Sequence, residues 1–439
     1  MINETHDPAH RSWVESANDP AGDFPLQNLP FGVFRAASGD GEWRVGVAIG
    51  DQILDVAAAR ATRLFDQAAS QAAATCLSGS LNGFMSLGAP HWSALRSAVS
   101  RLLRDDTPTG GVARKRAAEL LVPQRAAELQ LPARVHDYTD FYASLHHATN
   151  VGSMFRPDQP LLPNYKWIPI GYHGRASSIV VSGTPVRRPV GQVGNDGATP
   201  PAVGATRRLD YEAEVAFFVG PGNALGAPVP IGEASRQLFG VALLNDWSAR
   251  DMQAWEYQPL GPFLAKNFAT TVSPWVVTME ALAPFRVAAF TRPAGDPVPL
   301  PYLADADDQA HGGIDLTVDV YLRSAGMRLA GIPPARLSRS NLRDLYWTPA
   351  QLLAHHASNG CNLQPGDVLG SGTISGASKE SRGCLLELTW KGSEPIVLPT
   401  REERRFLEDD DEVMIRGRCE RAGFASIGFG SCEGMVVGA

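Results

Sequence analysis

The chain has 439 residues, of which 44% are hydrophobic and 19% are charged, and its net charge is −7. A mildly acidic chain has no long-range attraction for nucleic acid or for anionic membranes, so both are excluded as partners. The length predicts two or three domains, and the plentiful glycine and proline favour a turn-rich, β-heavy protein.

The cysteines and the N-terminus bear on the cellular compartment. The five cysteines are odd in number and form no C-x-x-C, so we expect neither a disulfide framework nor a zinc site. The first residues, MINETHDPAHRSW, lack an apolar signal core, and no apolar run approaches the roughly 20 residues that span a bilayer. We therefore expect a soluble, cytoplasmic protein.

The first third of the chain combines a small β unit with helices. Residues 1–22 are polar, with Pro, Gly and Asp, and are expected to be flexible. Short apolar runs alternate with Gly and Asp turns from about residue 24 to residue 56, which predicts a small β unit. Ala and Leu have helical spacing in 92–104 and 113–121. We place the domain boundary near residue 132, which gives domains 1–132 and 133–439.

Beyond that boundary, strand-like segments recur, rich in Val and Phe and bounded by Gly, Pro or Asp. They are 177–183, 214–220, 240–244, 316–322, 384–390 and 412–417. Few long helical patterns lie between them, which favours a mainly β (α+β) domain over a doubly wound parallel sheet. Residues 292–312 are rich in Pro and Asp and predict a long loop.

Four carboxylates could hold a metal ion. Glu212 and Glu214 alternate along an expected strand, so they lie on one face, where a cation relieves their repulsion. The alternative is a solvated strand edge. Asp246 ends an apolar strand and could enter a cleft, or it could belong to a helix start in which Ser248 is the cap. Asp140 lies in DYTDFY, where the local sequence favours a surface turn.

A histidine and a glutamate are candidates for acid–base chemistry. His147 could take a proton from water near neutral pH. Glu387 lies inside the expected strand 384–390, where a carboxylate is costly unless it is paired. It could fix the tautomer of His147 or form a structural salt bridge. The sequence alone does not distinguish His147 from its neighbour His146.

Other polar residues have weaker signals. Gln253 and Tyr257 are four residues apart, so they share a helix face that could contact a substrate or simply pack. Arg156 and Lys266 could bind carboxylates or remain surface charges. The segment 370–376 (GSGTISG) predicts a tight loop that brings backbone close to a ligand. Because no G-x-S-x-G motif occurs, a serine hydrolase is disfavoured.

Long motifs in this chain resemble those of the fumarylacetoacetate hydrolase family. The resemblance runs from about Phe24 to the C-terminal SIGFGSCEG and is densest in four segments, 137–156, 171–189, 209–223 and 245–275. It implies a small N-terminal SH3-like barrel followed by a large C-terminal β-roll of the family's type. It also implies a homodimer and a divalent cation, Mg²⁺ or Ca²⁺. Two loops, 193–200 and 376–383, depart from the family pattern.

The resemblance also implies roles for single residues. The implied metal ligands are Asp140, Glu212, Glu214 and Asp246, and the metal site is also lined by Lys266 and Thr270. The implied catalytic groups are His147 as the base, Glu387 as its orienting partner, and Arg156, Gln253 and Lys266 as donors to developing negative charge. The implied substrate contacts are Tyr142, Arg156, Tyr172, Gln253, Tyr257 and Thr373.

The implied activity is hydrolysis of a carbon–carbon bond in a small dicarboxylic β-diketone, fumarylacetoacetate, at the last step of tyrosine and phenylalanine breakdown. One alternative is an acylpyruvate hydrolase or oxo-acid lyase of the same superfamily, against which the long N-terminal part speaks. The other alternative is a non-enzymatic calcium-binding or scaffold protein. That second alternative gives no reason for the motifs around His147 and Glu387.

Overall fold

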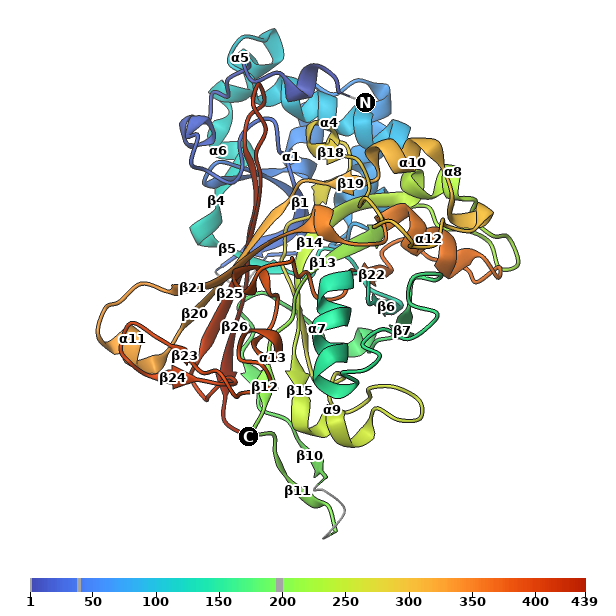
Figure 1. Cartoon of the computed structure of the whole chain (residues 1–439). Helices are drawn as coiled ribbons and strands as arrows, with labels where there is room; N and C mark the ends of the chain where they lie inside the picture. The colour runs from blue at the N-terminus through green and yellow to red at the C-terminus, as the bar shows by residue number, and fades with distance from the viewer. Residues whose placement is uncertain (1, 38–40, 195–199) are drawn as a thin grey trace.

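The computed structural model describes residues 2–37, 41–194 and 200–439 of the chain (Figure 1). Most of the loop 193–200, which departs from the family pattern, lies outside these ranges. Helices and strands are mixed, and the strands form several sheets, which agrees with the coarse α+β prediction. Within the described ranges, no helix has both the length and the apolar character needed to cross a bilayer.

The N-terminal part is built on an antiparallel five-stranded sheet with the order β4-β3-β2-β1-β5. Its strands are β1 (Phe31–Ala36), β2 (Arg44–Ile49), β3 (Gln52–Asp55), β4 (Leu121–Pro123) and β5 (Ala127–Gln130). Its helices are α1 (Val56–Ala61), α2 (Gln67–Ala74), α3 (Asn82–Met85), α4 (Ala89–Leu103), α5 (Pro108–Lys115) and α6 (Ala117–Leu120). The β unit expected over 24–56 and the helix expected over 92–104 are confirmed.

One prediction for this part is wrong and another is confirmed only in part. Residues 2–22 are not loose, because Trp13 is buried and its Nε1 donates to the carbonyl of Leu102 on α4 at 2.9 Å. The local polarity does not predict this docking, since the partner helix is distant in sequence. The helical pattern at 113–121 is interrupted at Arg116, whose φ of −111° and ψ of 19° separate α5 from α6.

The central sheet positions the site. Its order is β7-β6-β22-β13-β14-β16-β8, with β17 beside β14. The strands are β6 (Tyr138–Phe141), β7 (Gly171–His173), β8 (Ile179–Val181), β13 (Ala213–Val219), β14 (Leu238–Asp246), β16 (Thr270–Val272), β17 (Val277–Thr278) and β22 (Val368–Gly370). Because β22 is parallel to β6 and antiparallel to β13, one end of the sheet gathers the ends of β6, β22 and β14 and the start of β13.

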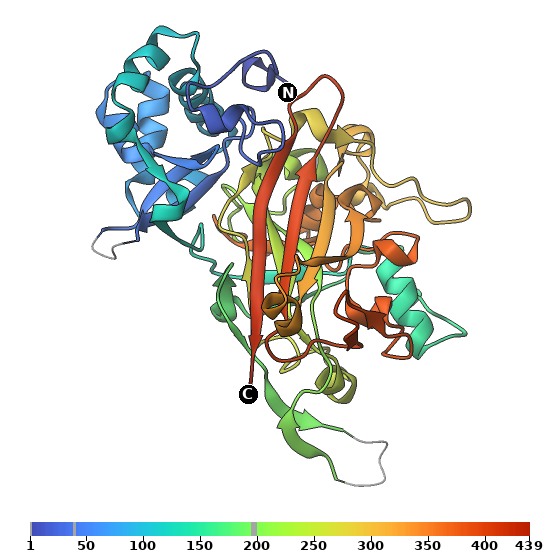
Figure 2. The same ribbon diagram turned by 90° about the vertical axis from the view of Figure 1, so that its left-hand side faces the viewer.

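A second five-stranded sheet covers one face of the central sheet. It consists of β9 (Val186–Arg187), β20 (Thr317–Arg323), β21 (Ala335–Asn341), β25 (Glu412–Cys419) and β26 (Ile427–Val437). Figure 2 shows the long strands β25 and β26, in red, running across this side of the molecule. Val215 and Phe217 face this second sheet, whereas Ala216 and Phe218 face the N-terminal part. The central strands are buried on both faces, so their sequences are continuously apolar instead of alternating.

The other elements lie around these layers. The helices are α7 (Leu145–Phe155), α8 (Ile231–Ala234), α9 (Arg250–Glu256), α10 (Ala306–His311), α11 (Ala325–Leu329), α12 (Pro349–Ala357) and α13 (Leu385–Leu388). The short strands are β10 (Val190–Val193), β11 (Ala202–Ala205), β12 (Leu209–Asp210), β15 (Ser248–Ala249), β18 (Arg286–Val287), β19 (Gly313–Ile314), β23 (Ile396–Val397) and β24 (Glu403–Arg404). The hairpin β10–β11 projects from the body in both views (Figures 1 and 2).

Two local predictions in this part are wrong, and one alternative is excluded. The segment 384–390 is not a strand, because it contains the short helix α13. The stretch 292–312 is not a continuous loop, since Asp305 caps the helix α10 inside it. Ser248 does not cap α9: it lies in β15, and the cap position is Ala249, whose side chain accepts no hydrogen bond.

Candidate active site

Three buried carboxylates converge at the end of the central sheet. Asp140 lies on β6, Glu214 near the start of β13, and Asp246 at the end of β14. One carboxylate oxygen from each residue lies within 4.8 Å of one oxygen from each of the other two. All three side chains are buried, so the surface turn that local sequence favoured for Asp140 is wrong, as is the solvated edge considered for Glu214.

The carboxylate trio Asp140, Glu214 and Asp246 fits a divalent cation. Asp140 Oδ1 and Glu214 Oε1 are buried and have no hydrogen-bond partner among the described residues, although buried polar atoms nearly always have one. Burial and the neighbouring carboxylates raise the pKa of Asp140 and of Glu214 well above the usual range. A cation would supply the missing partner and keep these groups ionised, and hard divalent ions prefer an all-oxygen donor set of this kind.

Glu212 makes a different set of contacts from the trio. Its Oε1 forms an ion pair with Arg250 at 2.8 Å, and its Oε2 accepts from Lys266. Lys266 also donates to Asp246 Oδ2 at 2.8 Å, and Thr270 donates to Asp246 Oδ1 at 3.0 Å. Burial acts to raise the pKa of Glu212, but Lys266 and Arg250 outweigh it and lower that pKa below the usual range. Glu212 is therefore an ionised carboxylate beside the trio.

His147 and Glu387 form a buried pair between α7 and α13, which lie against each other (Figure 1). The distance from His147 Nδ1 to Glu387 Oε2 is 2.6 Å, and Asn150 and Ser375 each donate to the same carboxylate at 2.8 Å. Burial acts to raise the pKa of Glu387, but these three partners outweigh it and lower the pKa to about 2. An ionised acceptor at Nδ1 assigns the proton there. The basic lone pair is then on Nε2, which lies 3.9 Å from Glu212 Oε1.

The structure distinguishes the two adjacent histidines. The ring of His146 lies edge-on to Phe290, at a centroid distance of 6.4 Å, on α7 but away from Glu387. His147 is the buried one of the two, with 3% of its surface exposed. The pairing with Glu387 therefore belongs to His147.

Three predicted substrate residues line the same cluster. The Tyr142 ring is edge-on to His147, with centroids 5.3 Å apart. The Tyr172 hydroxyl donates to Asp246 Oδ2 at 3.3 Å. Thr373 follows β22, and its Oγ1 is buried with no hydrogen-bond partner within the described ranges. A buried hydroxyl of this kind is free to bond a ligand.

Three other predicted residues lie outside the buried cluster. Arg156 is exposed at the end of α7, where it donates to the carbonyl of Pro160 at 3.2 Å. Gln253 on α9 accepts from Arg250 at 3.1 Å, so it is one residue removed from the carboxylates. Tyr257 follows α9 and is 38% exposed. These three residues therefore lie outside the group of buried carboxylates and His147.

Sequence reasoning missed a buried connection between the two halves of the site. Asp210 accepts from the first backbone N–H groups of α13 at 2.8 and 2.9 Å. The same carboxylate lies 2.9 Å from Arg250, and Arg250 in turn contacts Glu212. This connection, which we call the Asp210–Arg250 strut, ties the helix that carries Glu387 to the carboxylate side. Its spacing in sequence gives no signal, because α13 is remote from Asp210.

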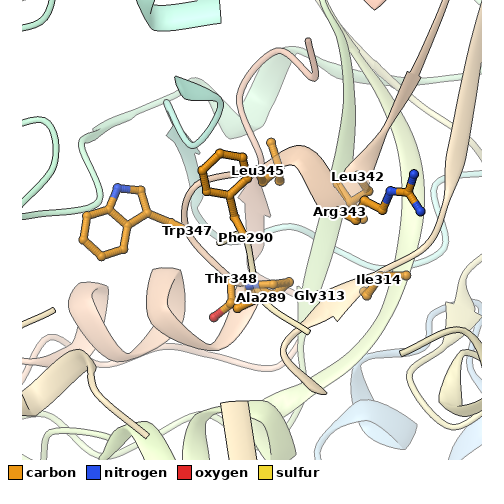
Figure 3. A pocket seen from close by; sticks show the side chains of 10 residues that line it. Ala289, Phe290, Gly313, Ile314, Leu342, Arg343, Leu345, Trp347 and Thr348 are labelled. Carbon is orange, nitrogen blue, oxygen red and sulfur yellow. The ribbon is translucent and has the colours of Figure 1, made fainter. Parts of the chain in front are cut away.

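Two cavities lie apart from this cluster. The first is lined by Phe290, Leu345 and Trp347, among others (Figure 3), and its volume is about 10 Å³, which is room for one water at most. The second has a volume of about 930 Å³ and lies between α4, α8 and α10, beside Trp92 and Arg286. Neither cavity is lined by a residue of the predicted site.

Comparison with known proteins identifies the family. The model for "Fumarylacetoacetate (FAA) hydrolase C-terminal" matches residues 137–437, and the model for "Fumarylacetoacetase N-terminal" matches residues 27–132. The chain belongs to the fumarylacetoacetase family. The fumarylacetoacetases of Bos taurus and Homo sapiens are each 50% identical to it, over 97% of this chain and 98% of theirs.

Membership in the fumarylacetoacetase family makes the chain an enzyme, a hydrolase, and removes the scaffold alternative. A solved structure described as a fumarylacetoacetate hydrolase from Exiguobacterium antarcticum is 16% identical and has a TM-score of 0.50, covering 94% of this chain and 100% of that one. At that identity the likeness supports the fold alone.

Proposed function

We propose that this enzyme hydrolyses the carbon–carbon bond of fumarylacetoacetate and releases fumarate and acetoacetate, a step in tyrosine and phenylalanine breakdown. The observation that carries the proposal is the 50% identity to fumarylacetoacetases over 97% of the chain. The buried pair of His147 and Glu387 beside a trio of carboxylates supports it chemically.

His147 and Glu387 have different roles in the proton transfer. Nε2 of His147 accepts a proton from water, and Glu387 holds Nδ1–H and stabilises the imidazolium that forms. The hydroxide bonds to the ketone carbon of the fumaryl group. The adjacent carbon–carbon bond then breaks, its electron pair leaves with the acetoacetate fragment, and the proton on Nε2 is available to that fragment. The net reaction consumes one water molecule and forms two acids, fumarate and acetoacetate.

Three side chains are proposed as donors to the negative charge that develops during the reaction. They are Lys266, Gln253 and Arg156, of which Lys266 is already buried beside the carboxylates. A donor aimed at such charge is often worth about 3–4 kcal/mol. Arg156 has to exchange its contact with the Pro160 carbonyl for the substrate.

The proposed cofactor is a divalent cation, Mg²⁺ or Ca²⁺. Asp140, Glu212, Glu214 and Asp246 would hold it, with Lys266 and Thr270 lining the site. The convergence of three of these carboxylates and the contacts of Glu212 and Asp246 with Lys266 and Thr270 support this set. Bound there, such an ion polarises a coordinated carbonyl oxygen and stabilises negative charge on it. The unpartnered oxygens of Asp140 and Glu214 are the support for this assignment.

A comparison of substrates tests the proposed function. We expect kcat/KM of the purified enzyme to be highest for fumarylacetoacetate and lower for acylpyruvates and oxaloacetate, because the relatives that match over the whole chain are fumarylacetoacetases. The loss of fumarylacetoacetate absorbance gives the rate. A higher kcat/KM for an acylpyruvate would contradict the proposal and favour the related acylpyruvate hydrolase.

We further propose the finer organisation of the enzyme. Residues 1–132 would form the SH3-like barrel domain and residues 133–439 the catalytic β-roll domain, which the meeting point of the two family models supports. The enzyme would act as a cytoplasmic homodimer. Large apolar side chains at the surface after α9, such as Leu260 (96% exposed) and Phe263 (67% exposed), support an interface.

A further inference from the structure

One helix binds both oxygens of the Glu387 carboxylate. His147 and Asn150 are three residues apart on α7, so their side chains lie on the same face of the helix. His147 Nδ1 is 2.6 Å from Glu387 Oε2, and Asn150 Nδ2 donates to Glu387 Oε1 at 2.8 Å. The Glu387 carboxylate therefore cannot rotate without breaking its hydrogen bond to His147 or to Asn150.

The opposite side of the carboxylate is also fixed. Ser375 Oγ donates to Glu387 Oε2 at 2.8 Å, and the same hydroxyl accepts from the backbone N–H of Gly383 at 3.0 Å. Ser144, which caps α7, donates to the backbone carbonyl of Ser375 at 3.0 Å. The loop after β22 is thereby tied to the helix that carries the base. Glu387 is fully buried, and a buried carboxylate that is only partly bonded would be free to reorient or to protonate.

We infer that Asn150 is a positioning residue for the reaction: through Glu387, it fixes the orientation and tautomer of His147. This inference rests on the proposed function, because it concerns the same base. The amide of Asn150 occupies Oε1, so Oε2 is left to His147, to Ser375 and to the Cys384 thiol, whose Sγ donates to it at 3.2 Å. Among the described residues, the side-chain hydrogen bond of Asn150 goes to Glu387, which is not one of the carboxylate trio, so we expect its effect to reach the chemistry through the base.

Kinetics of alanine variants test this inference. Asn150→Ala is expected to lower kcat for fumarylacetoacetate by about 10- to 100-fold, which is less than the full loss of a positioned base, roughly 10²- to 10⁴-fold, because the base itself remains. KM and the cation concentration that half-restores turnover after chelation should stay at their wild-type values. Ser153→Ala is the matched control on α7, since the Ser153 hydroxyl donates to the backbone carbonyl of Thr149 within the same helix at 2.8 Å.

A double-mutant cycle separates positioning from a general loss of structure. If Asn150 acts through the base, Asn150→Ala has no further effect on the residual turnover of a His147→Ala enzyme. Should Asn150→Ala lose its cooperative thermal transition, Asn150→Asp keeps the side-chain shape and replaces the donor by an acceptor, and the same fall in kcat is expected.

The failures of the two proposals are distinguishable. Wild-type kcat in Asn150→Ala, or a further fall of the same size in the His147→Ala background, would overturn the positioning role while leaving the proposed function intact. A wild-type enzyme that does not convert fumarylacetoacetate would overturn the proposed function itself.

Discussion

Replacing His147 by alanine is expected to lower kcat for fumarylacetoacetate by about 10²- to 10⁴-fold, the usual contribution of a positioned general base. The reason is geometric, because Nδ1 is held by Glu387 at 2.6 Å and Nε2 faces the carboxylate side of the site. The loss of substrate absorbance measures the rate. The thermal unfolding midpoint of the variant shows whether the fold has survived the loss of a buried ring.

The neighbouring histidine is the matched control for that experiment. His146→Ala removes the same side chain one position earlier on α7, but its ring packs against Phe290 and not against Glu387. Its kcat should stay near the wild-type value. Wild-type turnover in His147→Ala, or an equal loss in His146→Ala, would show that the base is assigned to the wrong residue.

Replacing Asp210 by alanine is expected to destabilise the protein by about 3–5 kcal/mol, the usual result of breaking a buried ion pair. The variant leaves the Arg250 guanidinium buried with Glu212 as its remaining carboxylate partner. It also removes the acceptor for the first N–H groups of α13, so Glu387 loses its support. The free energy of unfolding from urea titration measures the effect, and kcat is expected to fall with it.

An exposed ion pair provides the control for the strut. Arg116 Nη2 and Glu119 Oε2 lie 2.7 Å apart at the surface, and surface ion pairs contribute little to stability. Glu119→Ala should leave the urea midpoint where it is in the wild type. If Asp210→Ala behaved like Glu119→Ala, the Asp210–Arg250 strut would have no structural role.

Much of the central sheet was predictable, because its strands are long apolar runs bounded by turn residues. The segments 214–220 and 240–244 correspond to β13 and β14. The segment 384–390 looked the same but contains α13, since a short apolar run does not distinguish a buried strand from a buried helix. The helix at this segment is stabilised by Asp210, whose carboxylate accepts from the backbone N–H of Leu385 at the start of α13. The two residues are 175 positions apart in the sequence. No local pattern contains that contact.

The site was predictable to a different degree at each residue. The local surroundings of Asp140 favoured a surface turn, and only pairing of β6 with the distant β22 makes it a buried partner of Glu214. Family motifs, not physics, selected His147 over His146. The sequence places Asn150 three residues after His147, on the same face of the helix. Its role in binding Glu387 becomes clear only from the position of Glu387 in the structure. The contacts that build the site join segments that are far apart in the sequence, so no local pattern predicts them.

Turnover of fumarylacetoacetate before and after chelation asks whether the carboxylate trio holds a working cation next to His147. We expect chelation to abolish the loss of substrate absorbance and added Mg²⁺ or Ca²⁺ to restore it. The double variant Asp140→Asn, Glu214→Gln should stay inactive at any concentration of either ion. Undiminished turnover by the fully chelated wild-type enzyme would contradict the proposed metal-assisted hydrolysis.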